Sequence, residues 1–164
     1  MPQIKTALFS ALNLFLLIIF SVWFWNLNQP VTLVTPTLPD HGNMQCASYA
    51  PYYKPGQSPF IKGTHISKQQ IRHDLAILAQ RFDCVRTYSV GQGLDYVPEA
   101  AAEIGLEVLL GVWIGWTEAE NQKELKLGIK LANQYPDVIR GLIIGNEVLL
   151  RQEQPRDKLI AYIQ

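Results

Sequence analysis

The chain has 164 residues with 14 basic and 14 acidic side chains, so its formal net charge at pH 7 is zero. This balance excludes the positive surplus with which proteins bind nucleic acid phosphates. Only 17% of the residues are charged, against roughly 25% in an average soluble domain. The first 27 residues carry a single charge, and the other 137 have the composition of one globular domain.

An uncharged apolar run occupies residues 7–27. As a helix it is long enough to cross a hydrocarbon core about 30 Å thick. Lys5 precedes it, and Trp23 and Trp25 lie where an interfacial aromatic belt is expected. We therefore predict a cytoplasmic stub over 1–6 and an uncleaved single-pass signal anchor in the cell (inner) membrane. The C-terminal domain then lies on the periplasmic or extracellular side.

The alternative for this run is a cleaved signal peptide. The apolar part of such a peptide spans about 7 to 15 residues and ends in small residues before the cut. The run here is longer and ends near Trp-Phe-Trp, which favours the anchor. Residues 28–43 contain Pro30, Pro36 and Pro39, and we expect a semi-extended Pro/Thr-rich linker there, followed by one folded domain over 44–164.

Two cysteines, Cys46 and Cys84, lie in the exported part, where a disulfide can persist. Each falls in an expected core strand, so we favour two separate buried thiols. The histidines His41, His65 and His73 are scattered, without zinc-ligand spacing. We expect no metal site. No GxGxxG or P-loop sequence follows a strand, so no cofactor is expected either.

Helix signals recur through residues 44–164. Ser67-x-x-Gln70 is a capping box that opens a helix with the apolar face Ile71, Leu75 and Leu78. Asp95 is expected to cap a second helix, which Gly105 ends.

A third helix is predicted after Thr117-x-x-Glu120, another capping box. Its apolar side is expected to be Leu125, Ile129 and Ala132. A fourth begins near Pro155, a residue favoured at the first helical position. Its apolar side is expected to be Leu159, Tyr162 and Ile163.

Four runs between these helices predict strands: Gln45–Tyr49, Cys84–Tyr88, Leu106–Trp113 and Ile139–Asn146. The last two are nearly continuous in apolar residues, as in parallel strands covered by helices. Alternating strands and helices predict a parallel α/β sheet, either doubly wound or part of a barrel.

Functional residues in parallel α/β folds gather at the carboxyl ends of the strands. The residues expected there include several aromatic residues, one arginine, one amide and one carboxylate. The full set is Tyr49, Pro51, Tyr52, Tyr53, Arg86, Thr87, Tyr88, Trp113, Trp116, Asn146 and Glu147. Sugar rings stack on aromatic faces, while amides and charged groups bind their hydroxyls. This set predicts a carbohydrate site.

Glu147 ends a buried apolar run, where an ionised carboxyl group needs a partner or a raised pKa. A carboxyl group that stays protonated can act as a general acid. The alternative, of equal weight from the residues alone, is that Glu147 merely pairs with Arg86 or Arg151.

Four segments together resemble the bacterial branch of glycoside hydrolase family 17. They are Ser48-Tyr-Ala-Pro-Tyr with Gly56-Gln-Ser-Pro59, Val85-Arg-Thr-Tyr-Ser89, Leu110-Gly-Val-Trp-Ile-Gly115 with Asn121, and Ile144-Gly-Asn-Glu-Val-Leu-Leu-Arg151. The resemblance implies a β-1,3-glucan hydrolase or glucanosyltransferase on a (β/α)8 TIM barrel. Residues 44–164 are then the N-terminal half of that barrel, with four βα units.

The resemblance also implies the site residues. Glu147 matches the acid/base, and Asn146 contacts the β-glucan substrate near its 2-hydroxyl. Arg86 and Tyr88 support the carboxylates. Tyr49 and Trp113 line a sugar subsite.

The family's nucleophile is a second glutamate, at the end of the seventh strand, and we expect it to be absent from this chain. A (β/α)8 barrel takes roughly 250 residues, and retaining hydrolysis needs two carboxyl groups about 5 to 5.5 Å apart. Glu118, Glu120 and Asp95 are not convincing substitutes. We therefore expect these 164 residues to be a membrane-anchored glycosidase truncated before its nucleophile and inactive by itself.

Two alternatives remain open at this stage. One is a membrane-tethered glucan-binding or inactive fragment, in which the aromatic residues bind sugar without turnover. The other is the hydrolase-like part of a β-glucan synthase or transglycosylase.

Overall fold

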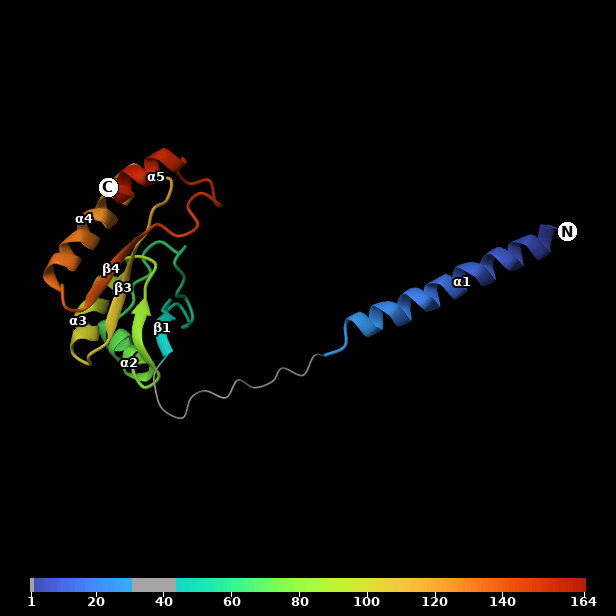
Figure 1. Ribbon diagram of the computed structural model, residues 1–164, viewed down its shortest axis with the longest axis horizontal. Helices are drawn as coiled ribbons and strands as arrows, with labels where there is room; N and C mark the ends of the chain where they lie inside the picture. Colours follow the sequence, from blue (N-terminus) through green and yellow to red (C-terminus); the bar gives the residue numbers. More distant parts are fainter. Residues whose placement is uncertain (1, 31–43) are drawn as a thin grey trace. The chain divides into compact units, whose positions relative to one another are not determined.

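The computed structural model describes residues 2–30 and 44–164, and the chain divides into two compact units after residue 39 (Figure 1). The first unit holds one helix, α1 (Pro2–Leu27). Its segment Ile4–Leu27 is long and apolar enough to cross a membrane, a property that signal sequences share. Most of the predicted linker, residues 31–43, lies outside the described residues.

The second unit alternates strands with helices in the predicted order. Its elements are β1 (Met44–Ser48), α2 (Lys68–Leu78), β2 (Phe82–Arg86), the 3-10 helix η1 (Leu94–Tyr96), α3 (Val97–Ala102), β3 (Glu107–Val112), α4 (Glu118–Gln134), β4 (Ile139–Ile144) and α5 (Arg156–Ile163). Every predicted strand is present. Each ends one or two residues earlier than predicted, so the polar residues that follow lie in loops beyond the sheet.

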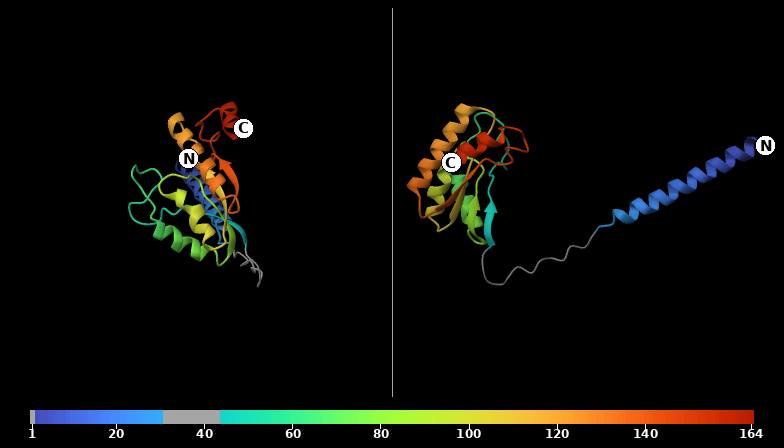
Figure 2. Two further views of the ribbon diagram at one scale, coloured as in Figure 1. Left: turned by 90° about the vertical axis from the view of Figure 1, so that its left-hand side faces the viewer. Right: turned by 45° about the horizontal axis from the view of Figure 1, so that its top comes forward.

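The four strands form one parallel sheet in the order β1-β2-β3-β4 (Figure 2). A doubly wound sheet reverses its strand order at a switch point, and this sheet does not. Consecutive parallel strands, each followed by a helix, are the arrangement of a barrel. The strand order therefore agrees with four successive βα units of a barrel, which the family resemblance implied and the alternation of strands and helices alone left open.

One face of the sheet packs against the helices. In β3 the side chains of Val108, Leu110 and Val112 are fully buried in two hydrophobic clusters, while Leu109 between them is only half-buried. From α2, Ile71 and Leu75 enter the same core, as the helical periodicity predicted. Because successive strand side chains point to opposite faces, Leu109 and the residues in equivalent positions lie on the face away from these helices.

Helix ends follow the predicted signals only in part. The Ser67 hydroxyl accepts a hydrogen bond from the Gln70 backbone N–H at 3.2 Å, which confirms the first capping box. The expectation for Asp95 is wrong, because it lies inside η1, which starts directly after Gly93 in a left-handed conformation (φ +91°). Thr117 is the N-cap of α4, but its side chain makes no capping bond.

The buried side of α4 is rotated from the predicted one. Ile129 is 52% exposed, and Gly128 faces the sheet instead. A Cβ at Gly128 would collide with the Val112 side chain, so the missing side chain lets α4 approach β3 closely. The periodicity of apolar residues could not reveal this, because glycine carries no hydrophobic signal.

The expectation of two separate thiols is also wrong, since Cys46 and Cys84 form a disulfide. The two residues are direct partners in the register of β1 and β2, and their Cα atoms lie 4.3 Å apart. Two cysteines in different strands meet only if the register aligns them. A single sequence does not specify that register.

Replacing both cysteines, as in Cys46→Ser/Cys84→Ser, removes a cross-link over a sequence separation of 38 residues. We expect the free energy of unfolding to fall by about 2–4 kcal/mol, because the unfolded chain regains loop entropy. The measurement is urea unfolding of the detergent-solubilised protein, with and without dithiothreitol. The reductant should bring the wild type to the value of the double variant and leave the variant unchanged. Equal stability of the oxidised wild type and the variant would contradict the prediction.

Candidate active site

The carboxyl ends of β2 and β4 are joined by Arg86. Its Nη2 donates a hydrogen bond to Oδ1 of Asn146 at 2.9 Å. Its guanidinium carbon lies 3.8 Å from the centroid of the Tyr88 ring, a cation–π contact. Three of the predicted site residues are therefore in direct contact, although they come from strands separated by β3.

Tyr88 also contacts β1. A hydrogen bond with the Ser48 side chain and then the charge of Arg86 lower the pKa of the Tyr88 hydroxyl, while the negative charge of Glu147 opposes this shift. The pKa of Tyr88 thus responds to groups of β1, of β2 and of the turn after β4.

Glu147 lies in a tight turn after β4. Gly145 and Glu147 both have left-handed backbone angles, with φ of +78° and +53°. This conformation costs a residue with a Cβ about 1–2 kcal/mol, and such strain is typical of functional sites. Although Glu147 follows a buried apolar run, the turn leaves its side chain 59% exposed.

Arg151 is the counter-charge of Glu147. Its Nη1 lies 3.4 Å from Glu147 Oε2, and its Nη2 donates to Glu153 at 2.7 Å. Its guanidinium carbon lies 4.5 Å from the centroid of the Trp113 ring. Of the two pairings foreseen for Glu147, the structure has the one with Arg151.

Tyr49 belongs to the packed side of the sheet. It is 5% exposed, and its hydroxyl donates to Asp74 Oδ2 of α2 at 3.0 Å. Burial and then the negative charge of Asp74 raise the pKa of Tyr49 far above its ordinary value. Tyr49 therefore acts as a neutral hydrogen-bond donor between β1 and α2.

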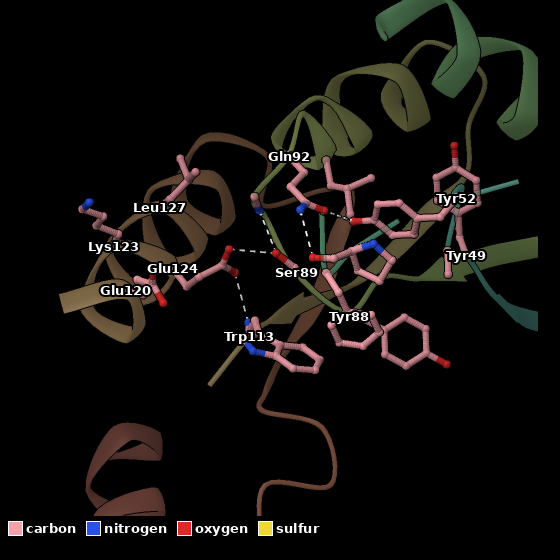
Figure 3. Close-up of a pocket in the computed structure, with 15 residues that line it drawn as sticks. Tyr49, Tyr52, Tyr88, Ser89, Gln92, Trp113, Glu120, Lys123, Glu124 and Leu127 are labelled. Carbon is pink, nitrogen blue, oxygen red and sulfur yellow. Dashed lines mark hydrogen bonds between the residues drawn. The ribbon is translucent and has the colours of Figure 1, made fainter. Parts of the chain in front are cut away.

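A pocket of about 760 Å³ lies beside these residues (Figure 3). The predicted site residues Tyr49, Tyr88 and Trp113 line it, together with residues of the loops after β1 and β2 and of α4. These further residues include Tyr52, Phe60, Gln92, Glu120, Lys123 and Glu124.

Glu124 connects the ends of β2 and β3, and sequence reasoning missed it. Its Oε1 accepts a hydrogen bond from the Ser89 hydroxyl at 2.7 Å. Its Oε2 accepts from the backbone N–H of Trp113 at 3.0 Å (Figure 3). It also accepts from the backbone N–H of Val90 at 3.0 Å. Nothing in the sequence distinguishes this glutamate from its solvent-facing neighbours on α4.

Glu118, another acidic residue near the strand ends, has partners of its own. Glu118 pairs with Lys158 at 2.6 Å and accepts from the Tyr162 hydroxyl at 2.6 Å, which joins α4 to α5. The hydrogen bond with Lys158 and then that with Tyr162 lower the pKa of Glu118 to about 2.

Across residues 2–30 and 44–164, no group of three His, Cys, Asp or Glu side chains could hold a metal ion.

Replacing Glu124 by glutamine puts an NH2 group where a carboxylate oxygen now accepts hydrogen bonds. We expect Glu124→Gln to lower the free energy of unfolding by about 1–3 kcal/mol, because partly buried N–H donors lose their acceptor. Glu120→Gln, one helical turn away and exposed, is the matched control and should stay within about 0.5 kcal/mol. Both are measured by urea unfolding. Equal stabilities would show that Glu124 is not a structural clamp.

Parallel strands in barrel order, with polar and aromatic residues at their carboxyl ends, define a barrel-type domain with its site at the strand ends. The chain belongs to the BtgE/BtgC glycoside hydrolase domain family, which matches residues 46–164.

Relatives and a solved structure agree with this assignment. The probable beta-glucosidase btgE of Aspergillus flavus is 31% identical over 124 residues, which cover 74% of this chain and 19% of that protein. The probable glucan endo-1,3-beta-glucosidase btgC of Aspergillus oryzae is 30% identical over 107 residues, covering 59% of this chain and 16% of that protein. This chain thus spans about a fifth of the length of these curated relatives.

The fold is similar to that of the glycoside hydrolase family 17 beta-1,3-glucanosyltransferase of Rhizomucor miehei. The TM-score is 0.57 with 22% identity, over 72% of this chain and 42% of the other. An active-site mutant of this enzyme in complex with laminaritriose matches equally well, over 73% and 42%. These matches confirm the predicted fold class, four βα units of a family 17 barrel.

Proposed function

We propose that residues 44–164 form the acid/base half of a retaining glycoside hydrolase or glucanosyltransferase that acts on β-1,3-glucans. The observation that carries this proposal is the position of Glu147 in a strained turn at the carboxyl end of β4, directly after Asn146, which accepts a hydrogen bond from Arg86. The family, the named relatives and the laminaritriose complex of the structural neighbour support the substrate class. The four motifs favour the bacterial branch of family 17.

Glu147 first acts as general acid and protonates the glycosidic oxygen while a second carboxylate attacks the anomeric carbon. It then acts as general base and takes a proton from water or from an acceptor sugar hydroxyl. Arg151 provides a counter-charge at 3.4 Å for the carboxylate that forms after the first step. The incoming group, water or sugar, decides between hydrolysis and transfer.

Asn146 is oriented for the substrate by Arg86. Because Oδ1 of Asn146 accepts from Arg86 at 2.9 Å, its NH2 group is left to donate to a sugar oxygen such as the 2-hydroxyl. Trp113 and Tyr88 offer aromatic surface for a sugar ring. Tyr49 is proposed to support this wall from the core through Asp74, since its own hydroxyl is engaged there.

The second carboxylate is proposed to come from outside these 164 residues. Glu118 is held by Lys158 and Tyr162, and Asp95 lies within η1. Neither offers a free carboxylate beside Glu147. The family resemblance instead indicates a glutamate at the end of a seventh strand.

Glu147→Gln in the full-length protein is the direct test. We expect release of reducing sugar from laminarin to fall at least about a hundredfold, because the amide cannot donate or accept the proton. Glu107→Gln is the control, since Glu107 pairs with Arg140 at the opposite end of β3. Unfolding temperatures establish that both variants fold.

A substrate with an activated leaving group separates an acid role from a nucleophile role. An aryl β-glucoside whose phenol leaves without protonation needs no acid in the first step. Glu147→Gln should therefore keep a burst of phenol release at that step. Loss of both activities, or full activity on laminarin, would contradict the acid/base role.

We also propose that α1 is a membrane anchor with its amino end in the cytoplasm. Its apolar span of Ile4–Leu27, the preceding Lys5 and the Cys46–Cys84 disulfide, which persists in oxidising compartments, support an exported domain.

Protease added to spheroplasts should therefore digest the α/β domain while a cytoplasmic marker protein survives. Mass spectrometry of the protein isolated from membranes should find α1 still attached. Protection of the domain until lysis would reverse the orientation, and loss of α1 would identify a cleaved signal peptide.

A further inference from the structure

The segment after β4 contains a second glutamate, which the proposed mechanism does not use. The side chain of Glu153 is 9% exposed, whereas that of Glu147 is 59% exposed. Oε2 of Glu153 lies 2.7 Å from Nη2 of Arg151, so one guanidinium contacts both carboxylates. A buried carboxylate is unfavourable without a charged partner, and Arg151 provides that partner. Glu153 is the closer of the two acids to the guanidinium and the better shielded from water.

The backbone brings Glu153 back toward Arg151. Gln152, between them, has a left-handed conformation with φ of +57°. The backbone N–H of Glu153 donates to the carbonyl of Val148 at 3.0 Å, and the side chain of Val148 is buried in a core cluster. Glu153 is thus tied to the packed part of the domain, whereas the side chain of Glu147 is open to solvent.

Arg151 is held by Glu153 more closely than by Glu147. Its two ion-pair distances are 2.7 Å to Glu153 and 3.4 Å to Glu147. The hydrogen bond with Glu153 raises the pKa of Arg151, burial opposes this shift, and the charges of Glu153 and then of Glu147 add to it. The Trp113 ring, with its centroid 4.5 Å from the guanidinium carbon, contacts the same group. Arg151 is therefore a fixed cation whose main counter-ion is Glu153.

This order of partners suits a proton donor at position 147. A general acid carries a proton before the glycosidic bond breaks and a negative charge afterwards. A guanidinium without another partner would favour the charged form at both stages, because an opposite charge within about 4–6 Å lowers the pKa of a carboxyl group by roughly 1–3. Glu153 neutralises much of the charge of Arg151. The cation therefore has a counter-ion whether Glu147 is protonated or ionised.

We propose that Glu153 is a positioning residue that acts through Arg151 and keeps Glu147 available in its protonated form. The inference rests on the proposed function and deepens it. In the acid step the proton of Glu147 passes to the glycosidic oxygen as the bond to the anomeric carbon breaks. Arg151 then has both carboxylates as partners, and Glu153 keeps its contact throughout.

Other charged or titratable groups come from the neighbouring elements. Arg86 and Tyr88 at the end of β2 contact each other, and the charges of Arg86 and Glu147 both act on Tyr88. Glu118 of α4 and Lys158 of α5 form an ion pair at 2.6 Å. These groups are unchanged when Glu153 is replaced, so a change in pH dependence reports on the contact between Glu153 and Arg151.

The test is the pH profile of kcat/KM of the full-length protein on laminarin. Glu153→Gln keeps a hydrogen-bond acceptor for Arg151 but removes the charge. We expect the alkaline limb, which follows loss of the proton from the acid, to move down by about one pH unit. Phenol release in the first step on the activated aryl β-glucoside needs no acid and should stay within about twofold of the wild-type rate. Glu103→Gln, which removes a carboxylate paired with Arg72 at 2.6 Å, is the matched control and should leave the profile unchanged.

Arg151→Gln gives a second measurement of opposite sign. Without the guanidinium, the negative charge of Glu153 faces Glu147 directly, so the alkaline limb should move to higher pH. In Arg151→Gln/Glu153→Gln this negative charge is also gone, and the limb should lie below that of Arg151→Gln. Unfolding temperatures establish which variants fold. If Glu153→Gln does not fold, this pair decides, since equal limbs of the single and the double variant would overturn the inference.

The outcomes separate this inference from the proposed function. An unchanged alkaline limb in Glu153→Gln, or an equal loss of activity on both substrates at every pH, would overturn the inference while the wild type still cleaves laminarin. If the wild type cleaves no β-1,3-glucan, the proposed function fails, and NMR titration of carboxyl-labelled glutamate decides the coupling, with Glu147→Gln assigning the signal. A lower titration midpoint of Glu147 in Glu153→Gln then supports it, and an equal midpoint overturns it.

Discussion

Helices cover one face of the parallel sheet in this domain, and this constraint decides where the functional side chains lie. Side chains alternate along a strand, so residues such as Val108, Leu110 and Val112 enter the core. The residues between them point to the opposite, uncovered face of the sheet. The residues that follow each strand lie together at the carboxyl end of the sheet. The site is thus a consequence of parallel pairing, since only parallel strands bring all their carboxyl ends to one edge.

Charge–ring contacts and hydrogen bonds organise that edge. Arg86 and Arg151 each lie against an aromatic ring and each contact a residue of the turn after β4. Glutamate with a left-handed backbone is a strained choice at position 147. Glu147 is held there beside the Arg151 guanidinium with its side chain exposed, and backbone strain of this kind is typical of functional sites.

The proposed active site and the pocket beside it share the aromatic residues Tyr49, Tyr88 and Trp113. Glu124 holds the backbone of Trp113 and the loop after Tyr88 from the side of the pocket. Arg151 and Arg86 contact the rings of Trp113 and Tyr88 from the side of Glu147. The ring of Tyr88 and the side chain and backbone of Trp113 are therefore held from both sides.

The sequence by itself determined the order of strands and helices, the apolar N-terminal helix and which residues follow each strand. These features depend on hydrophobic periodicity, capping residues and short motifs, all of which involve residues close together in the chain. The family motifs also implied the barrel, which the strand order confirmed. The tertiary structure alone decided the Cys46–Cys84 disulfide, the exposure of Glu147 and the clamp made by Glu124. Each of these depends on register or on contacts between distant segments. Such contacts follow from how strands align and how closely helices approach, and neither is encoded in a local pattern.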